Sequence, residues 1–393
     1  MRKIGVGIAG YGFIGRVHAH AHRSIPLFYR PLPLQTELVG VSTASQASGL
    51  SAVQEAGFQF HTRSYQDLLQ HPGIDIIDIC TPNDTHFRIC RDAILAGKHV
   101  YCDKPLALDA AEAAELAALA RSSNVVCQMT FNCRFVPAIM RARQLTESGF
   151  LGQLTGFRAQ YLHAGYIDAE RKHTWRLSMA RSGGGAIADL GSHAIDLVRF
   201  LTGSATGVER GGEWAAVSAT LQTLIGERPN GYGQLTPVDV DDIAIAQVKL
   251  EGGAVGTLEA SRLATGVQDQ LVVQLHGLNG SISFDLMDPN WLEVYDAREP
   301  EAALGGDRGI KRIETVARFP QPYALGAVKN TVGWLQFHIQ CLYDFVNSIN
   351  SKEQGGPGSP YSPTFTDGLA VQRVIGAVQK SAANGSAWTP VEN

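Results

Sequence analysis

The chain has 393 residues, of which 45% are hydrophobic and 18% are charged, and its formal net charge is −4. This length predicts about two domains, because single hydrophobic cores stop growing near ~250–300 residues. The small negative charge, without a basic block, argues against nucleic acid as a partner, and no apolar run approaches the roughly 18 residues that cross a bilayer. The 6 cysteines form no Cys-x-x-Cys pair. We therefore expect reduced thiols and a cytoplasmic location.

The N-terminal third alternates between strand and helix patterns. Residues 3–9 predict a buried strand, the following glycines a turn, and residues 14–23 a helix, which is the opening of a βαβ unit. Further elements are a helix over Asp109–Ser122 and short apolar strands near Glu37–Ser42 and at Ile74–Cys80, His99–Cys102 and Val125–Met129. The pattern predicts an α/β domain over residues 1–128 with a doubly wound parallel sheet.

From about residue 130 the pattern changes to long strands with hairpin-type turns. The predicted strands are Gly152–Leu162, Asp241–Leu250, Ala254–Ser261, Gln270–His276 and Ser281–Asp285. Helices near 188–202 and 334–350 are expected to cover one face of this sheet, and residues 205–237 and 300–330 to form loops. The second domain is therefore predicted over 129–393 as an α/β domain with a large open, mostly antiparallel sheet. Its last helix, 366–383, is a candidate to pack back toward the first domain.

Gly10, Gly12 and Gly15 form a Gly-x-Gly-x-x-Gly motif between a predicted strand and a predicted helix. The first glycine permits a tight turn, the second lets the backbone approach a pyrophosphate, and the third permits close helix packing. The phosphates would then meet free N–H groups at the positive end of a helix. This context predicts a Rossmann domain that binds a dinucleotide.

The identity of the dinucleotide depends on the end of the second strand, where this fold usually carries an acid that binds the adenosine ribose. Thr43 stands at that position. The missing carboxylate removes repulsion toward a 2′-phosphate, but no Arg or Lys is adjacent to bind one. We expect NAD with weak discrimination, and NADP is left open.

Three polar residues have the chemistry of alcohol oxidation. His193 can take a hydroxyl proton because imidazole titrates near working pH. Asp189 lies four residues earlier, so on a helix the two side chains share one face and can hold neighbouring substrate oxygens. Lys104 supplies a positive charge for a developing alkoxide, and Pro105 biases it away from helical backbone. Together they predict hydride transfer from a secondary alcohol.

Five motifs resemble, as a set, those of the glucose-fructose oxidoreductase/inositol dehydrogenase (Gfo/Idh/MocA) family. They are Gly10–Gly15, Thr81-Pro82-Asn83-Asp84-Thr85-His86, Asp103-Lys104-Pro105, Asn132-Cys133-Arg134 and Gly183–His193. The likeness runs from residue 3 to the end, and among members it is greatest to inositol- and levoglucosan-dehydrogenase-like ones. Asp103 replaces the glutamate of the family's Glu-Lys-Pro motif, and Thr43 is the larger departure.

The resemblance implies an enzyme that oxidises or reduces a secondary alcohol of a sugar or cyclitol, with the open sheet joining subunits of a homodimer or homotetramer. It implies catalysis by Lys104, Asp189 and His193. The predicted cofactor-binding residues are Gly10, Gly12, Phe13, Ile14, Gly15, Thr43, Thr81, Pro82, Asn83, His86, Asp103, Lys104, Trp175 and Arg176. The predicted substrate-binding residues are Lys104, Asn132, Arg134, His163, Tyr166, Asp189, His193 and His338.

Some alternatives stay open at this point. Arg262 is a further candidate to contact a polyol. His18, His20 and His22 suggest a metal site, but the sequence places no acid or cysteine near them, which argues against one. We expect no metal. Two other functions are a non-catalytic NAD(P)-binding regulator and a glycosidase-like enzyme that uses bound NAD transiently. The three catalytic candidates favour the dehydrogenase.

Overall fold

The computed structural model describes residues 2–29, 32, 34–203, 212–316 and 330–392. Among these, residues 2–135 and 333–369 form one compact unit, the first unit, and residues 136–316, 330–332 and 370–392 form the second unit. The predicted boundary at 128/129 therefore falls before the division after Phe135. Segment 333–369, which the sequence pattern assigns to the second domain, belongs to the first unit.

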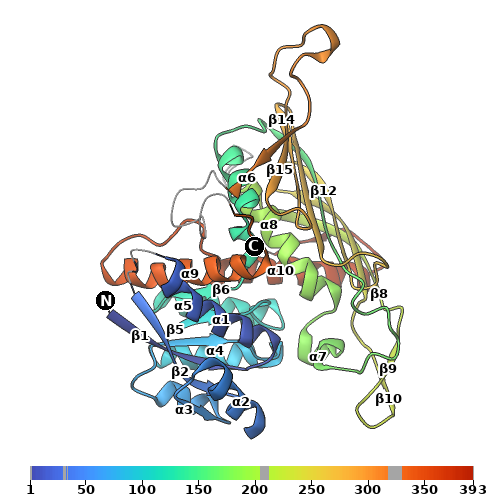
Figure 1. Cartoon of the computed structure of the whole chain (residues 1–393). Coiled ribbons are helices and arrows are strands. Elements are labelled where there is room, and N and C mark those ends of the chain that lie inside the picture. The colour runs from blue at the N-terminus through green and yellow to red at the C-terminus, as the bar shows by residue number, and fades with distance from the viewer. Residues whose placement is uncertain (1, 30–31, 33, 204–211, 317–329, 393) are drawn as a thin grey trace. The chain divides into compact units, whose positions relative to one another are not determined.

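The first unit contains a six-stranded parallel sheet with strand order β3-β2-β1-β4-β5-β6 (Figure 1). Its strands are β1 Arg2–Ala9, β2 Leu34–Ser42, β3 Phe60–Thr62, β4 Ile76–Ile79, β5 His99–Cys102 and β6 Cys127–Met129. Its helices are α1 Phe13–Phe28, α2 Gln46–Ala56, α3 Tyr65–Gln70, α4 His86–Leu95, α5 Ala110–Ser122 and α9 Trp334–Glu353. The predicted doubly wound Rossmann sheet is confirmed.

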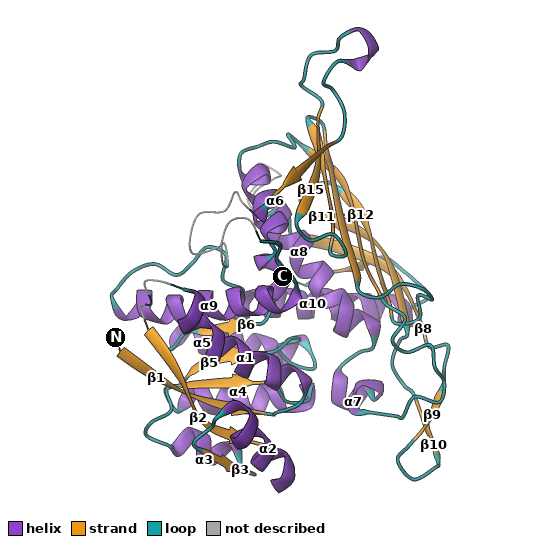
Figure 2. Ribbon diagram, viewed as in Figure 1, coloured by secondary structure: helices purple, strands orange, loops and turns teal. Residues whose placement is uncertain are grey.

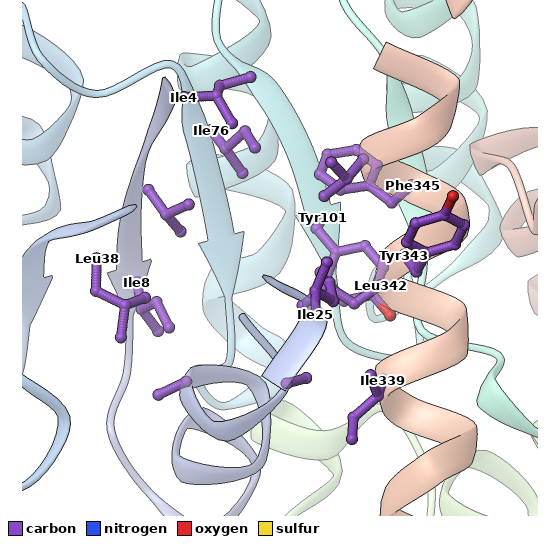
Figure 3. Close-up of a cluster of buried hydrophobic side chains, with 14 of the residues drawn as sticks. Ile4, Ile8, Ile25, Leu38, Ile76, Tyr101, Ile339, Leu342, Tyr343 and Phe345 are labelled. Carbon is purple, nitrogen blue, oxygen red and sulfur yellow. The ribbon is translucent and has the colours of Figure 1, made fainter. Parts of the chain in front are cut away.

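Helix α9 packs against α1, so the prediction that helix 334–350 covers the second sheet is wrong. Its apolar side chains Leu342 and Phe345 are fully buried beside Tyr101 of β5 (Figure 3). Tyr343 stacks on Tyr29 with ring centroids 4.0 Å apart, and the Tyr29 hydroxyl donates to Gln340. An amphipathic pattern shows that a helix buries one face, but not which surface that face meets.

The second unit contains a nine-stranded sheet in the order β16-β15-β14-β13-β7-β12-β11-β8-β17 (Figure 2). Its strands are β7 Leu154–Leu162, β8 Trp214–Gln222, β11 Ile243–Leu250, β12 Val255–Ser261, β13 Gln270–Gly277, β14 Gly280–Asp285, β15 Trp291–Asp296, β16 Lys311–Glu314 and β17 Thr389–Pro390. Strands β9 Glu227–Pro229 and β10 Leu235–Pro237 form a separate pair. Among the strands described in this sheet, only β7 and β12 pair in parallel. The large, mostly antiparallel sheet is confirmed.

One face of this sheet is covered by α6 Pro137–Glu147 and α8 Ser192–Thr202. Alternate residues of β13, such as Leu271 and Val273, are buried beneath this cover, whereas Gln270 and Gln274 lie on the other face. The two-period alternation of an antiparallel strand explains this difference. The second face is thus mixed rather than apolar throughout.

The predicted loops need a correction. Region 205–237 contains β8, β9 and β10, and region 300–330 contains β16. Residues 204–211 and 317–329 lie outside the described residues, so those parts of the two predictions are not addressed. β8 pairs with β11 and β17, both distant in sequence, which an Ala- and Ser-rich segment does not reveal locally.

The last helix, α10 Phe365–Ala383, begins in the first unit, where Gly368 lies against Leu106 and Met129. From Ala370 onward it belongs to the second unit, where Ser381 accepts a hydrogen bond from the Ala219 amide. The other helices described in the second unit are short: α7 Met179–Ser182, a π-helical turn at Ile187–Gly191 and 3-10 turns. Within the described residues, no helix combines the length and apolarity needed to span a membrane.

Candidate active site

The glycine turn between β1 and α1 has the shape of a dinucleotide cradle. Gly10 has φ +93°, and an added Cβ there would lie 2.6 Å from the Cys80 carbonyl oxygen. A Cβ at Gly15 would lie 2.2 Å from the Gly10 carbonyl oxygen, whereas a Cβ at Gly12 would meet nothing within 4 Å. Gly10 and Gly15 are therefore required by the turn itself. Gly12 leaves open space beside the N-terminus of α1, where a pyrophosphate fits.

Phe13 and Thr43 flank this turn in different ways. Phe13 is 72% exposed and stacks on Trp334 of α9, with ring centroids 5.7 Å apart. Thr43 is buried, and its hydroxyl donates to the Ser45 carbonyl at 2.8 Å. The end of β2 therefore presents no carboxylate to a ribose.

His86 joins the loops that follow β4 and β5. Its Nδ1 is 2.8 Å from the Pro105 carbonyl oxygen and its Nε2 is 2.9 Å from the Thr81 carbonyl oxygen. Carbonyls only accept, so both ring nitrogens must donate and the ring is a cation. Burial alone would lower the pKa of His86, but the neighbouring Cys102 sulfur and the Pro105 carbonyl outweigh it and raise the pKa to about 9. His86 thereby ties the Lys104-Pro105 segment, whose peptide bond is cis, to the Thr81-Pro82-Asn83 segment.

We expect His86→Gln to destabilise the protein by about 1–3 kcal/mol, the usual contribution of hydrogen bonds to a charged group. Because the folded pKa is raised to about 9 above the unfolded value near 6.5, the stabilisation is complete below about pH 6.5. It should disappear as pH rises through about 9. Urea unfolding of both proteins across this range measures the difference.

His99→Gln is the matched control. Burial lowers the pKa of His99, whose Nδ1 accepts the Val126 amide at 2.9 Å. The contribution of His99 should therefore be present above about pH 6.5 and be lost as pH falls. A His86→Gln difference that stays constant from about pH 6 to 10 would show that the ring is not a cation in the folded protein.

A second buried network lies between α1 and β4. The Asp78 carboxylate is 2.8 Å from His18 Nδ1 and 3.2 Å from His22 Nε2, and all three side chains are at most 1% exposed. Both histidines hold the pKa of Asp78 well below its usual range despite its burial. Cys80 lies 3.2 Å from His18 Nδ1, so His18, Asp78 and Cys80 also have the residue types of a metal site. Their spacings are those of hydrogen bonds, and the absence of a metal stays a prediction.

Asp189 lies on a π-helical turn, Ile187–Gly191, that leads directly into α8 and His193. The Asp241 carboxylate accepts the Gly185 amide at 2.7 Å and the Ile187 amide at 2.8 Å, which caps the start of the turn. A Cβ at Gly185 would lie 1.8 Å from the Asp241 carbonyl oxygen, so this close approach requires glycine. π-Helical turns are frequent at functional sites. The predicted regular helix over 188–202 is thus interrupted at Asp189.

Different groups contact the side chains of Asp189, on this turn, and of His193, at the start of α8. The Asp189 side chain is 26% exposed, and its Oδ2 accepts a hydrogen bond from the Arg262 guanidinium at 3.0 Å. The His193 ring is 9% exposed and meets Tyr161 of β7 edge-on, with centroids 5.8 Å apart. The Tyr161 hydroxyl donates to Asp269 at 2.8 Å. The partly exposed Asp189 carboxylate can accept hydrogen bonds from an alcohol. The His193 imidazole, packed against Tyr161, can take the hydroxyl proton.

Other predicted site residues are more deeply buried. In the first unit, Asn132 is 2% exposed and Arg134 pairs with Asp367 at 3.0 Å. His338 is 4% exposed and packs against Trp334 of its own helix, with ring centroids 4.4 Å apart. Substrate contacts by these three residues stay predictions, and the structure supplies each with a packing role.

In the second unit, His163 is half-buried, and its Nδ1 accepts the Gly165 amide at 2.9 Å. Burial lowers the pKa of His163 despite the nearby Asp189 carboxylate. Tyr166 is 5% exposed and lies under the Arg171 and Arg262 guanidinium groups. Trp175 and Arg176 stack on each other, with the guanidinium 4.3 Å from the ring centroid. Their cofactor or substrate contacts stay predictions.

Asp241 and Asp78 were not predicted as site residues, and Arg262 was only a candidate for direct substrate contact. Each contacts a partner far away in sequence, and the fold brings the two together. Asp78 lies within β4, Asp241 precedes the start of β11, and Arg262 follows the end of β12. The local signals are the acidic run Asp239-Val240-Asp241-Asp242, which overlaps the start of the predicted strand Asp241–Leu250, and the single acid Asp78 inside the apolar strand Ile74–Cys80. A buried carboxylate requires a hydrogen-bonding or charged partner, but the sequence does not identify that partner.

A parallel Rossmann sheet with a dinucleotide cradle, joined to an α/β unit that carries an Asp/His pair, defines a dinucleotide-dependent oxidoreductase. Residues 4–131 match the NAD-binding Rossmann fold of the Gfo/Idh/MocA oxidoreductase family, and residues 139–283 match a C-terminal domain of that family. The chain belongs to the Gfo/Idh/MocA family and is an NAD-binding oxidoreductase.

Similar proteins cover nearly the whole chain. It is 31% identical to levoglucosan dehydrogenase of Pseudarthrobacter phenanthrenivorans over 100% of its own length and 99% of the relative's. It is 26% identical to the scyllo-inositol 2-dehydrogenase (NAD(+)) of Bacillus subtilis, over 94% of this chain and 96% of the relative. A solved levoglucosan dehydrogenase in complex with NADH and L-sorbose superposes with a TM-score of 0.91 at 32% identity, covering 100% of both chains.

Proposed function

We propose that the chain transfers a hydride between NAD and one secondary alcohol carbon of a sugar or cyclitol. The observation that carries this proposal is the Asp189/His193 pair, with a partly exposed carboxylate on the π-helical turn and a buried imidazole on the first turn of α8. The relatives that act on levoglucosan and inositol supply the substrate class.

In the oxidation direction, the carbinol C–H bond breaks with its electron pair and the hydroxyl proton leaves. NAD, when bound, would supply the hydride acceptor, with the Gly10–Gly15 turn holding its pyrophosphate and the Thr81–Asn83 segment lying beside its nicotinamide ribose. His193 takes the hydroxyl proton as general base, and Asp189 holds the reacting polyol by accepting hydrogen bonds from its hydroxyls. Lys104 stabilises the negative charge that develops on the alcohol oxygen. Reduction runs the same steps in reverse.

A substrate panel tests this proposal. Levoglucosan, L-sorbose, scyllo-inositol, myo-inositol and common monosaccharides are supplied with NAD and with NADP in parallel, and reduced nicotinamide is followed by absorbance. We expect turnover of at least one polyol. Because Thr43 offers neither a carboxylate nor a cation, we expect NAD to be preferred by less than about a thousandfold, roughly 4 kcal/mol. Bound NAD without turnover of any polyol would favour a regulator, and turnover without accumulating NADH would favour the glycosidase-like chemistry.

We further propose a homodimer or homotetramer joined through the uncovered face of the second-unit sheet. Ile245 and Val255, on paired strands β11 and β12, are 52% and 56% exposed on that face. Exposed apolar side chains on a broad sheet favour a partner surface. Light scattering should give a dimer or tetramer mass, and a monodisperse monomer at micromolar concentration would contradict the assignment.

The location of the protein is also a proposal. Cys80, Cys90, Cys102, Cys127, Cys133 and Cys341 are all free thiols. Free, mostly buried cysteines are typical of proteins in a reducing compartment. We propose that the protein works in the cytoplasm.

A further inference from the structure

Arg262 follows β12 directly and is buried behind Asp189, with 1% of its surface exposed. One guanidinium nitrogen donates to Asp189 Oδ2 at 3.0 Å and the other to the Arg176 carbonyl at 3.3 Å. The guanidinium carbon lies 4.8 Å from the centroid of the Tyr166 ring. The backbone of Arg262 is fixed as well, because its amide donates to the Asp242 carbonyl and its carbonyl accepts the Tyr166 amide.

A cation this deeply buried needs a charged partner, because removing it from water costs several kcal/mol. Asp189 is the carboxylate bonded to it, and Asp241 is a second carboxylate in its surroundings. Burial would lower the pKa of Arg262, but the charge of Asp189 outweighs it, so the pKa is raised and the guanidinium remains charged. The pair is asymmetric, since Asp189 keeps 26% of its side chain exposed while Arg262 offers almost none.

We propose that Arg262 is a positioning residue that fixes the Asp189 carboxylate for polyol binding without touching the polyol. The inference rests on the proposed role of Asp189 in holding the substrate. A planar guanidinium held by a backbone carbonyl and an aromatic ring restricts where Oδ2 can lie, and with it the orientation of the whole carboxylate. Misplacing a substrate-holding group weakens binding of the alcohol more than it affects the chemical step.

The test is a double-mutant cycle on kcat/KM for the polyol, built from Arg262→Gln, Asp189→Ala and the double variant. Arg262→Gln should lower kcat/KM about 10- to 100-fold, mostly through KM, the range expected for loss of a hydrogen bond between charged groups. In the Asp189→Ala background, Arg262→Gln should lower kcat/KM by less than about twofold, because the carboxylate that Arg262 positions is already absent. Calorimetric affinity for NADH should be unchanged in all four proteins. Arg262→Lys keeps the charge and should restore part of the loss.

Arg228→Gln is the matched control. Arg228 is 0% exposed and also lies over the Tyr166 ring, 5.8 Å from its centroid, but it donates to the carbonyls of Tyr166 and Asp168. Any loss it causes should be the same factor with and without Asp189, as expected for a purely structural residue. Should Arg262→Gln fail to fold, Arg262→Lys replaces it in the cycle, with an expected coupling of the same sign but smaller size, because the lysine keeps the charge.

Two results overturn the inference while leaving the proposed function intact. One is an equal factor for Arg262→Gln in both backgrounds of an active enzyme. The other is coupling of the same size for Arg228 and Asp189, which would mark a general loss of local structure. Absence of polyol turnover by the unmodified enzyme would overturn the proposed function and, with it, this inference.

Discussion

His193→Ala should lower kcat about 10²- to 10⁴-fold while leaving NAD affinity nearly unchanged, because proton transfer by a positioned side chain typically contributes that much. The His193 ring is fixed edge-on against Tyr161, which the Asp269 carboxylate anchors in turn. Imidazole is the side chain whose ordinary pKa lies nearest working pH, which suits the role of general base. Steady-state kinetics with the best polyol of the panel, together with calorimetry for NAD, measures both quantities.

His20→Ala is the control for removal of an imidazole. His20 is exposed on α1 in the first unit and has no assigned part in the reaction. The kcat of the His20→Ala enzyme should stay within about twofold of that of the unmodified enzyme, as is usual for exposed surface positions. A His193→Ala enzyme that retains more than about a tenth of the original kcat would remove His193 from the role of general base.

Gly12→Val should reduce NAD affinity about 10- to 100-fold or more without destabilising the fold. A side chain forced into an occupied space costs typically ~1–3 kcal/mol, and here the occupant would be the pyrophosphate. A Cβ at Gly12 meets nothing within 4 Å in the protein itself. The melting temperature without cofactor should therefore be unchanged. Calorimetry with NAD on the folded variant measures the loss.

Gly15→Val provides the contrast, because its Cβ would lie 2.2 Å from the Gly10 carbonyl oxygen. The melting temperature of the Gly15→Val variant should therefore fall even in the absence of cofactor. If Gly12→Val is folded and binds NAD as tightly as the unmodified protein, the pyrophosphate does not lie at this turn.

The Rossmann half could be predicted from sequence because its signals are local. Strand, glycine turn and helix follow one another within residues 3–28, and β4 and β5 appear as short apolar runs bounded by polar residues. Strands of a parallel sheet that are buried on both faces carry this mark. The edge strand β3, Phe60–Thr62, is only partly buried, and the pattern does not predict it. The second unit depends on long-range pairing instead. β8 was missed because its Ala- and Ser-rich sequence becomes a strand through β11, about 25 residues later in the chain.

The catalytic candidates were nameable from sequence because the chemistry of alcohol oxidation demands few residue types. The residues that hold these candidates in place cannot be identified from the sequence. The Arg262 guanidinium and the Asp241 carboxylate reach the π-helical turn only because the ends of β12 and β11 lie beside it. His86 was assigned to the cofactor, but its ring also ties the loops after β4 and β5 together. A residue that links two loops in this way needs a hydrogen-bond partner in each loop, and the spacing of residues along the chain reveals neither partner.

The most direct test of the central claim, hydride transfer from a polyol to NAD, is isotopic. The enzyme is incubated with NAD and a polyol deuterated at its carbons. The reduced nicotinamide cofactor is then isolated, and its deuterium content is determined by mass spectrometry. We expect a single deuterium at nicotinamide C4, delivered from the carbon whose hydroxyl proton His193 removes. Reduced nicotinamide without deuterium, or an altered sugar with no reduced nicotinamide accumulating, would contradict it.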